Sequence, residues 1–180
     1  RLVSWPQHSN PGIRYYSGTA VYRTTFKTIA APPGRTAILD LGDVANIAGL
    51  SVNGRSAGVL WKPPFRADVA RLLRNGSNAL EVRVANRWIN RLIGDETVPV
   101  EYAYQPPGRS KFTDGRLLAL PAWLYDPSKL STRKRYSFST WKHYDADSPL
   151  VRSGLLGPVK LEWFEQLSLD PNRLPHGKPL

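Results

Sequence analysis

The chain of 180 residues contains no cysteine and no methionine. Without cysteine it can form no disulfide, no thiolate metal site and no thiol nucleophile. It also lacks a run of about 18 apolar residues, so we expect no membrane-spanning helix, and no signal-peptide pattern stands at its start. Because the chain begins at Arg1 and has no methionine, we expect it to be a fragment or a processed product of a longer protein.

Acidic residues are scarce: 14 Asp and Glu stand against 25 Lys and Arg, which gives a formal net charge of +11. Such an excess is typical of proteins that bind nucleic acids or acidic polymers. The basic residues are spread along the chain, and the densest cluster, Arg133–Arg135, lies in a strand-like segment. No known DNA- or RNA-binding motif accompanies it. A basic nucleic-acid-binding domain is therefore an alternative that the sequence does not favour.

What is present is a pattern of short strands. Residues 19–27 alternate polar and apolar, as do residues 79–85, where Leu80, Val82 and Val84 are expected to face inward. Asn53-Gly54 is a strong two-residue hairpin signal. Further strands are expected at residues 36–41, 47–52, 56–61, 134–140 and 158–164. The spacing of turns predicts an all-β sandwich of antiparallel strands over residues 1–167. A long irregular loop insertion at 87–130 and a disordered tail at 168–180 complete the prediction.

Two groups of segments resemble known families. Tyr15–Phe26, "YYSGTAVYRTTF", and Leu39–Val69, "LDLGDVANIAGLSVNGRSAGVLWKPPFRADV", resemble the sugar-binding β-sandwich of glycoside hydrolase family 2. Asn86–Pro99, "NRWINRLIGDETVP", and Tyr136–Leu161, "YSFSTWKHYDADSPLVRSGLLGPVKL", are similar to the C-terminal domain of family 106 α-L-rhamnosidases. The resemblance covers about residues 1–163. It implies a galactose-binding-domain-like jelly roll.

The same resemblance implies a catalytic barrel upstream in a parent enzyme that removes terminal L-rhamnose. The catalytic glutamates of the family lie in that barrel, and none of them maps onto this chain. The resemblance also implies a secreted or periplasmic location. We therefore expect the chain alone to be noncatalytic and to contact carbohydrate and the barrel domain.

Candidate sugar-binding residues stand where strands are expected to end. Sugars are bound by aromatic rings that stack on C–H faces and by planar polar groups that pair with hydroxyls. Clusters of both kinds of residue could converge on one loop face, although each tryptophan could instead pack in the core. The candidates are Trp61, Lys62, Asn86, Trp88, Asn90, Arg91, Trp141 and His143.

Asp95 and Glu96 are adjacent carboxylates. Glycoside hydrolysis needs two carboxylates on opposite sides of one sugar bond, whereas neighbours in an extended chain point in opposite directions. We expect no catalysis by this pair. Structuring of the loop through nearby arginines or backbone N–H groups is favoured, and ligand or interdomain contact stays open.

The run "YDADSP" contains Asp145 and Asp147, whose oxygens are of the kind that calcium prefers. The ligand series is incomplete, so a solvated turn is favoured over a metal site. A structural calcium ion is suggested only by the family resemblance. No other cofactor is expected.

The sequence leads to one main hypothesis and two alternatives. The main one is a noncatalytic, carbohydrate-associated β-sandwich of an α-L-rhamnosidase-type enzyme, which packs on or shapes the substrate site of a barrel. The first alternative is an independent lectin-like module for rhamnose-containing or acidic polysaccharide. The second is the nucleic-acid-binding domain.

Overall fold

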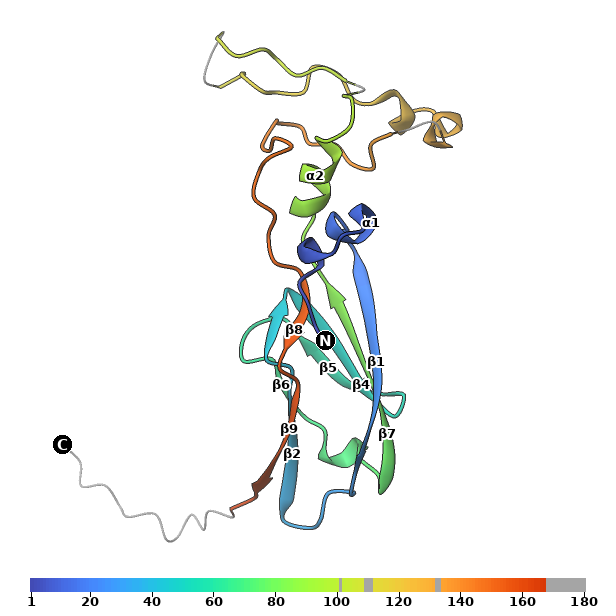
Figure 1. The fold of residues 1–180 in the computed structure, drawn as a ribbon, viewed down its shortest axis with the longest axis vertical. Coiled ribbons are helices and arrows are strands. Elements are labelled where there is room, and N and C mark those ends of the chain that lie inside the picture. The colour runs from blue at the N-terminus through green and yellow to red at the C-terminus, as the bar shows by residue number, and fades with distance from the viewer. Residues whose placement is uncertain (101, 109–111, 132–133, 168–180) are drawn as a thin grey trace, which may run out of the picture. The chain divides into compact units, whose positions relative to one another are not determined.

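A computed structural model describes residues 1–100, 102–108, 112–131 and 134–167. It confirms an all-β fold built from antiparallel sheets (Figure 1). The chain forms two compact units. The first unit comprises Arg1–Ala20 and Ala85–Leu156, and the second comprises Val21–Val84 and Gly157–Leu180. The tail predicted at 168–180 lies outside the described residues.

The strands of the two larger sheets lie almost entirely in the second unit. One has the strand order β1 (Thr19–Thr28), β7 (Gly76–Ala85), β4 (Ile47–Val52), β5 (Arg55–Leu60). The other has the order β6 (Arg66–Asp68), β2 (Arg35–Asp40), β9 (Lys160–Glu165). β9 runs antiparallel to β2, with Arg35 opposite Glu165 and Asp40 opposite Lys160. β3 (Asp43–Ala45) and a 3₁₀ turn, η2 (Ala70–Leu72), lie between the longer strands in sequence.

The core of this unit is made by alternate residues of its strands. Leu80, Val82 and Val84 of β7 are 7%, 1% and 0% exposed, as the alternation predicts. Buried residues of β4 and β2 join them, among them Leu50 and Leu39. Successive side chains of a strand point to opposite faces, so one face of each strand supplies the core.

The predicted hairpin at Asn53-Gly54 is confirmed. Both residues have positive φ, 51° and 76°, as a tight turn between β4 and β5 requires. The Asn53 side chain also ties the turn to β7, because its Oδ1 accepts a 3.0 Å hydrogen bond from the Ala79 N–H. Its Nδ2 donates to Asn78 Oδ1 at 2.8 Å.

Gly42 packs against the backbone of Gly157 and Pro158, just before β9. Its φ is +66°, and a Cβ there would stand 2.6 Å from the Gly157 carbonyl oxygen and 2.7 Å from that of Pro158. Gly42→Ala is expected to lower the free energy of unfolding by about 2–3 kcal/mol, since it adds a backbone clash to an unfavourable φ. Urea unfolding measures the loss.

Gly34→Ala is the matched control for that variant. Gly34 has a similar φ of +75°, but nothing lies within 4 Å of the added carbon. It should lose only about 1 kcal/mol. Equal losses in the two variants would contradict a steric requirement at Gly42.

The first unit is mostly irregular. Its helices are α1 (Pro11–Arg14) and α2 (Ile89–Asp95), with 3₁₀ turns η1 (Trp5–Gln7), η3 (Ala122–Leu124) and η4 (Pro127–Ser131). β8 (Gly154–Gly157) ends it. Within the described residues, no helix has both the length and the apolar character needed to cross a membrane.

Two predictions for the first unit were wrong. Residues 87–130 are not wholly irregular, because they begin with α2. Residues 134–140 do not form a strand. The N–H groups of Tyr136 and Ser137 donate to the Asp95 carboxylate, so these donors are used by a side chain rather than by a neighbouring strand.

Candidate functional site

Helix α2 is held in place by side-chain amides. Asn90 is fully buried, and it exchanges two 2.8 Å hydrogen bonds with the backbone of Val151. Asn86, just before the helix, accepts from the Gly18 N–H at 3.0 Å and donates to the Tyr16 carbonyl at 2.8 Å. An amide has one acceptor and two donor hydrogens. Both predicted sugar-binding asparagines thus direct these groups to other parts of the first unit.

Asp95, at the end of α2, is a buried carboxylate with several partners. Its side chain is 3% exposed, and its Oδ1 lies 2.8 Å from Arg91 Nη2. Oδ2 accepts from the Tyr136 N–H at 3.0 Å and from both the N–H and the Oγ of Ser137 at 2.6 Å. These bonds fasten a segment about 40 positions later in the chain to the helix end.

Close packing around α2 also explains a glycine. A Cβ on Gly94 would stand 2.6 Å from Tyr15 Cβ and 2.7 Å from Arg91 Nη2. The glycine therefore lets Tyr15 and the Arg91–Asp95 ion pair approach the helix backbone together.

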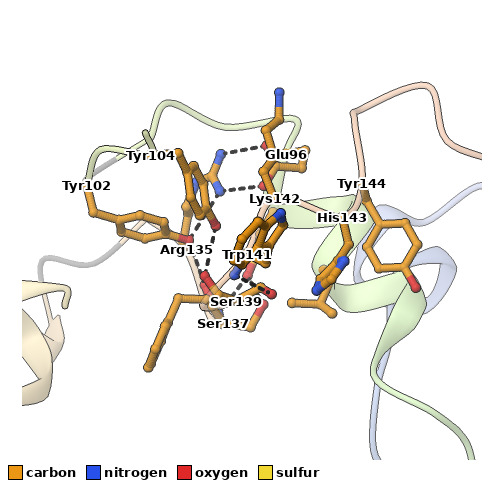
Figure 2. Close-up of a pocket in the computed structure, with 13 residues that line it drawn as sticks. Glu96, Tyr102, Tyr104, Arg135, Ser137, Ser139, Trp141, Lys142, His143 and Tyr144 are labelled. Carbon is orange, nitrogen blue, oxygen red and sulfur yellow. Dashed lines mark hydrogen bonds and ion pairs between the residues drawn. The ribbon is translucent and has the colours of Figure 1, made fainter. Parts of the chain in front are cut away.

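Glu96, the next residue, pairs with a buried arginine (Figure 2). Arg135 is 1% exposed, and its Nη1 donates to Glu96 Oε1 at 2.8 Å. The guanidinium also donates to the Val98 carbonyl at 3.0 Å and lies 5.6 Å from the centre of the Tyr102 ring. A guanidinium can satisfy several planar acceptors at once, so Arg135 organises the chain that follows α2.

Aromatic rings close this cluster. Tyr102 and Tyr104 pack edge to face at 5.6 Å, and the Tyr104 hydroxyl donates to the Ser139 carbonyl at 3.1 Å. Burial, with Tyr102 nearby, raises the pKa of Tyr104 above its ordinary value. The cavity left among these groups is only about 10 Å³. That is space for about one water molecule and not for a sugar.

Trp141 and His143 lie at the edge of the same cluster (Figure 2). Trp141 pairs with Arg116 through an isolated antiparallel bridge, and the neighbouring Lys142 N–H donates to the Gly115 carbonyl at 2.7 Å. Trp141 is thus part of a strand-like contact within the unit, whereas His143 is exposed beside Tyr144.

Trp88 and Arg91 line a separate pocket of about 350 Å³. Trp88 is 63% exposed and Tyr136 is 61% exposed. The Arg91 guanidinium carbon lies 5.1 Å from the centre of the Tyr136 ring. The remaining lining residues are Gly12, Tyr16 and Ser17. Three aromatic rings and one arginine thus surround an open hollow.

Trp61 and Lys62 belong to the second unit. Trp61 is 67% exposed, and the Lys62 ammonium lies 5.3 Å from the centre of the indole. Apart from Asn86 and Asn90, which bond within the first unit, the sugar-binding candidates fall into three places: this pair, the Trp88 pocket, and the Trp141 and His143 edge.

Side chains that ligate metals do not gather in groups of three or more in the part of the chain that the structure describes. Asp145 Oδ1 lies 2.7 Å from Lys142 Nζ, and the Asp145 N–H donates to Ser148 Oγ at 2.9 Å. The solvated turn stays the prediction for Asp145 and Asp147, with a calcium site as the less favoured alternative.

Sequence reasoning missed the residues that complete both clusters. Arg135 was grouped with a basic run, and Tyr16, Tyr102 and Tyr136 were not singled out. Each becomes significant only through contacts with α2 or with the chain that follows it. One signal for these contacts was available in the sequence. Asp95 follows Arg91 by four positions, and residues four apart are neighbours on a helix.

Comparison with known proteins relates the chain to carbohydrate-active enzymes. It is 42% identical over 170 residues to the "Putative beta-glucuronidase" of Formosa agariphila, covering 93% of this chain and 14% of that protein. It superimposes on the rhamnosidase of Novosphingobium sp. PP1Y with a TM-score of 0.68 and 34% identity, over 91% of this chain and 12% of that one. No family model matches the chain.

Both similarities run through almost the whole of this chain and a small part of each relative. The chain is therefore similar to one domain-sized segment of glycoside hydrolases. The two relatives are named for different sugars, so their names agree on the enzyme class and differ on the substrate.

Proposed function

We propose that the chain is a noncatalytic, carbohydrate-associated β-sandwich module of an α-L-rhamnosidase-type enzyme of family 106. The observation that carries this proposal is the structural match to the Novosphingobium rhamnosidase over 91% of the chain. In the parent protein the module packs on a catalytic barrel or shapes its substrate site.

The chemistry of the adjacent carboxylates supports a noncatalytic role. A glycosidase needs an acid and a nucleophile or base that reach one sugar bond. Asp95 is 2% exposed and accepts three hydrogen bonds, and Glu96 is held by Arg135. Both groups serve to tie the chain together.

The purified chain is expected to release no nitrophenol from 4-nitrophenyl α-L-rhamnoside or from 4-nitrophenyl β-D-glucuronide. The Novosphingobium rhamnosidase serves as the positive control on the rhamnoside. Turnover by the chain alone, retained after a second purification step, would overturn the noncatalytic role.

The parent enzyme can be tested directly. Sequencing the coding DNA upstream of Arg1 is expected to reveal an in-frame barrel-coding region. The product of the full reading frame should hydrolyse the rhamnoside faster than the glucuronide. Faster hydrolysis of the glucuronide would contradict the rhamnosidase proposal and favour a β-glucuronidase, the activity for which the Formosa relative is named.

An independent lectin-like role is the second candidate, and the Trp88 pocket favours it. Exposed aromatic rings beside a polar group are typical of sugar sites. This role and a place in a larger enzyme are compatible, because a module can hold a glycan while its neighbour acts on it.

A further inference from the structure

The Trp88 pocket has the dimensions of a small-ligand site. Its volume of about 350 Å³ lies at the lower end of the range for such sites, roughly 300–1,000 Å³. All six lining residues belong to the first unit. The hollow is thus a property of one compact unit.

Its walls offer aromatic surface. Trp88 and Tyr136 are each more than 60% exposed, and Tyr16 is 39% exposed. Single exposed rings are common on protein surfaces, whereas exposed apolar groups that gather in one hollow mark binding sites. A sugar ring presents flat C–H faces that such rings can cover.

Arg91 is the one charged residue that lines the pocket. Asp95, its ion-pair partner, has a 3% exposed side chain and is not part of the lining. The arginine of this ion pair therefore contributes to the wall of the hollow, and its carboxylate partner does not. A guanidinium forms strong, often paired, hydrogen bonds with a carboxylate.

The guanidinium is already positioned. One of its nitrogens, Nη2, lies 2.8 Å from Asp95 Oδ1, and its carbon stacks 5.1 Å from the Tyr136 ring centre. Its Nε is buried and has no hydrogen-bond partner among the residues that the structure describes. Because the side chain is held before a ligand arrives, little conformational freedom is lost on binding.

We propose that the pocket of Trp88, Arg91 and Tyr136 binds a carboxylate-bearing sugar residue of an acidic polysaccharide. The sugar ring stacks on Trp88, and its carboxylate pairs with Arg91. The net charge of +11 favours the approach of such a polymer. The proposal rests on the carbohydrate-associated role proposed above and adds the class of sugar and its site.

The test compares sugars that differ by the carboxylate alone. D-galacturonate and tetragalacturonate are titrated into the ¹⁵N-labelled chain, with D-galactose as the neutral match. The chain has six tryptophans, and the indole N–H signal of Trp88 is assigned as the one missing in Trp88→Ala. We expect this signal to shift saturably with galacturonate, at least about tenfold more tightly than with galactose.

Variants separate the two parts of the site. By isothermal titration calorimetry, which needs no Trp88 signal, Trp88→Ala should show no galacturonate binding, and Trp61→Ala, a similarly exposed tryptophan in the second unit, should bind as before. Arg91→Gln should lower the affinity for galacturonate to that for galactose.

Salt provides a separate test of the charge pair. Raising NaCl from about 0.05 M to about 0.5 M should weaken galacturonate binding severalfold, since charge pairs at a surface are screened. Thermal unfolding of each variant reports whether the fold persists.

Each other outcome overturns the proposal. Equal affinity for galactose and galacturonate removes the role of the carboxylate. A shift at Trp61 without one at Trp88 moves the site elsewhere, and no shift with either sugar at about 10 mM removes it, because such binding would be weaker than any specific site. None of these results changes the nitrophenyl glycoside assays, so failure of the site and failure of the proposed enzyme class are distinguishable.

Discussion

Asp95→Ala is expected to lower the free energy of unfolding by about 3–5 kcal/mol, among the largest losses of any single substitution in the chain. The change removes the acceptor of three hydrogen bonds and leaves Arg91 without its 2.8 Å partner. Buried donors that lose an acceptor keep the full cost of their desolvation. Denaturant unfolding monitored by tryptophan fluorescence measures the loss.

Asp145→Ala is the matched control, because it also removes an aspartate from a close ion pair in the first unit. Lys142 lies 2.7 Å away, but the Asp145 side chain is 69% exposed. Exposed pairs contribute at most about 1 kcal/mol. If both variants lost the same amount, Asp95 would not fasten the 136–137 segment to α2.

Arg135→Met is expected to cost a similar amount, about 3–5 kcal/mol, because it leaves Glu96 partly buried and unpaired. The Glu96 side chain is 14% exposed and that of Arg135 is 1% exposed. Methionine keeps much of the volume, so the loss reports the charge and the hydrogen bonds rather than a cavity. Hydrogen exchange should rise first in the amides of residues 98–108.

The double variant Arg135→Met with Glu96→Leu provides the sharper comparison. Replacing both partners of a buried pair by apolar groups is often nearly neutral, whereas removing one is not. We expect the double variant to be more stable than Arg135→Met alone. If its loss equals the sum of the two single losses, the pair contributes no coupling.

The sheets could be predicted from the sequence, and the region around α2 could not. Strands such as β7 can be recognised from the alternation of apolar and polar residues. Every second residue from Asn78 to Val84 is buried. The hairpin at Asn53-Gly54 can likewise be predicted from the sequence, because the turn depends on the backbone conformation of these two neighbouring residues. These features need no knowledge of distant partners.

Residues 134–140 show why the rest failed. The segment has the aromatic and hydroxyl residues of a strand, yet the N–H groups of Tyr136 and Ser137 donate to Asp95. Helix α2 is short, and no side chain caps its start; its support comes from Asn90 and from Tyr15 beside Gly94. Tertiary contacts outweigh local propensity here.

The same division holds for the candidate site. Trp88 and Arg91 could be found because a tryptophan and an arginine stand together just after a strand. Tyr16 and Tyr136 could not, since the sequence contains no sign that positions about 50 and 70 residues away would face the same hollow. Ring exposure and the place of Arg91, without Asp95, in the wall of the hollow are visible only in three dimensions.

The division of the chain into two discontinuous units has a consequence for its synthesis. Ser4 Oγ accepts a hydrogen bond from the Ser153 N–H, and β2 pairs with β9 across 130 residues at Arg35 and Glu165. A ribosome delivers the chain from its N-terminus. The early segments must therefore wait for partners that emerge 130 and 149 residues later, and neither unit can close before those partners have left the exit tunnel.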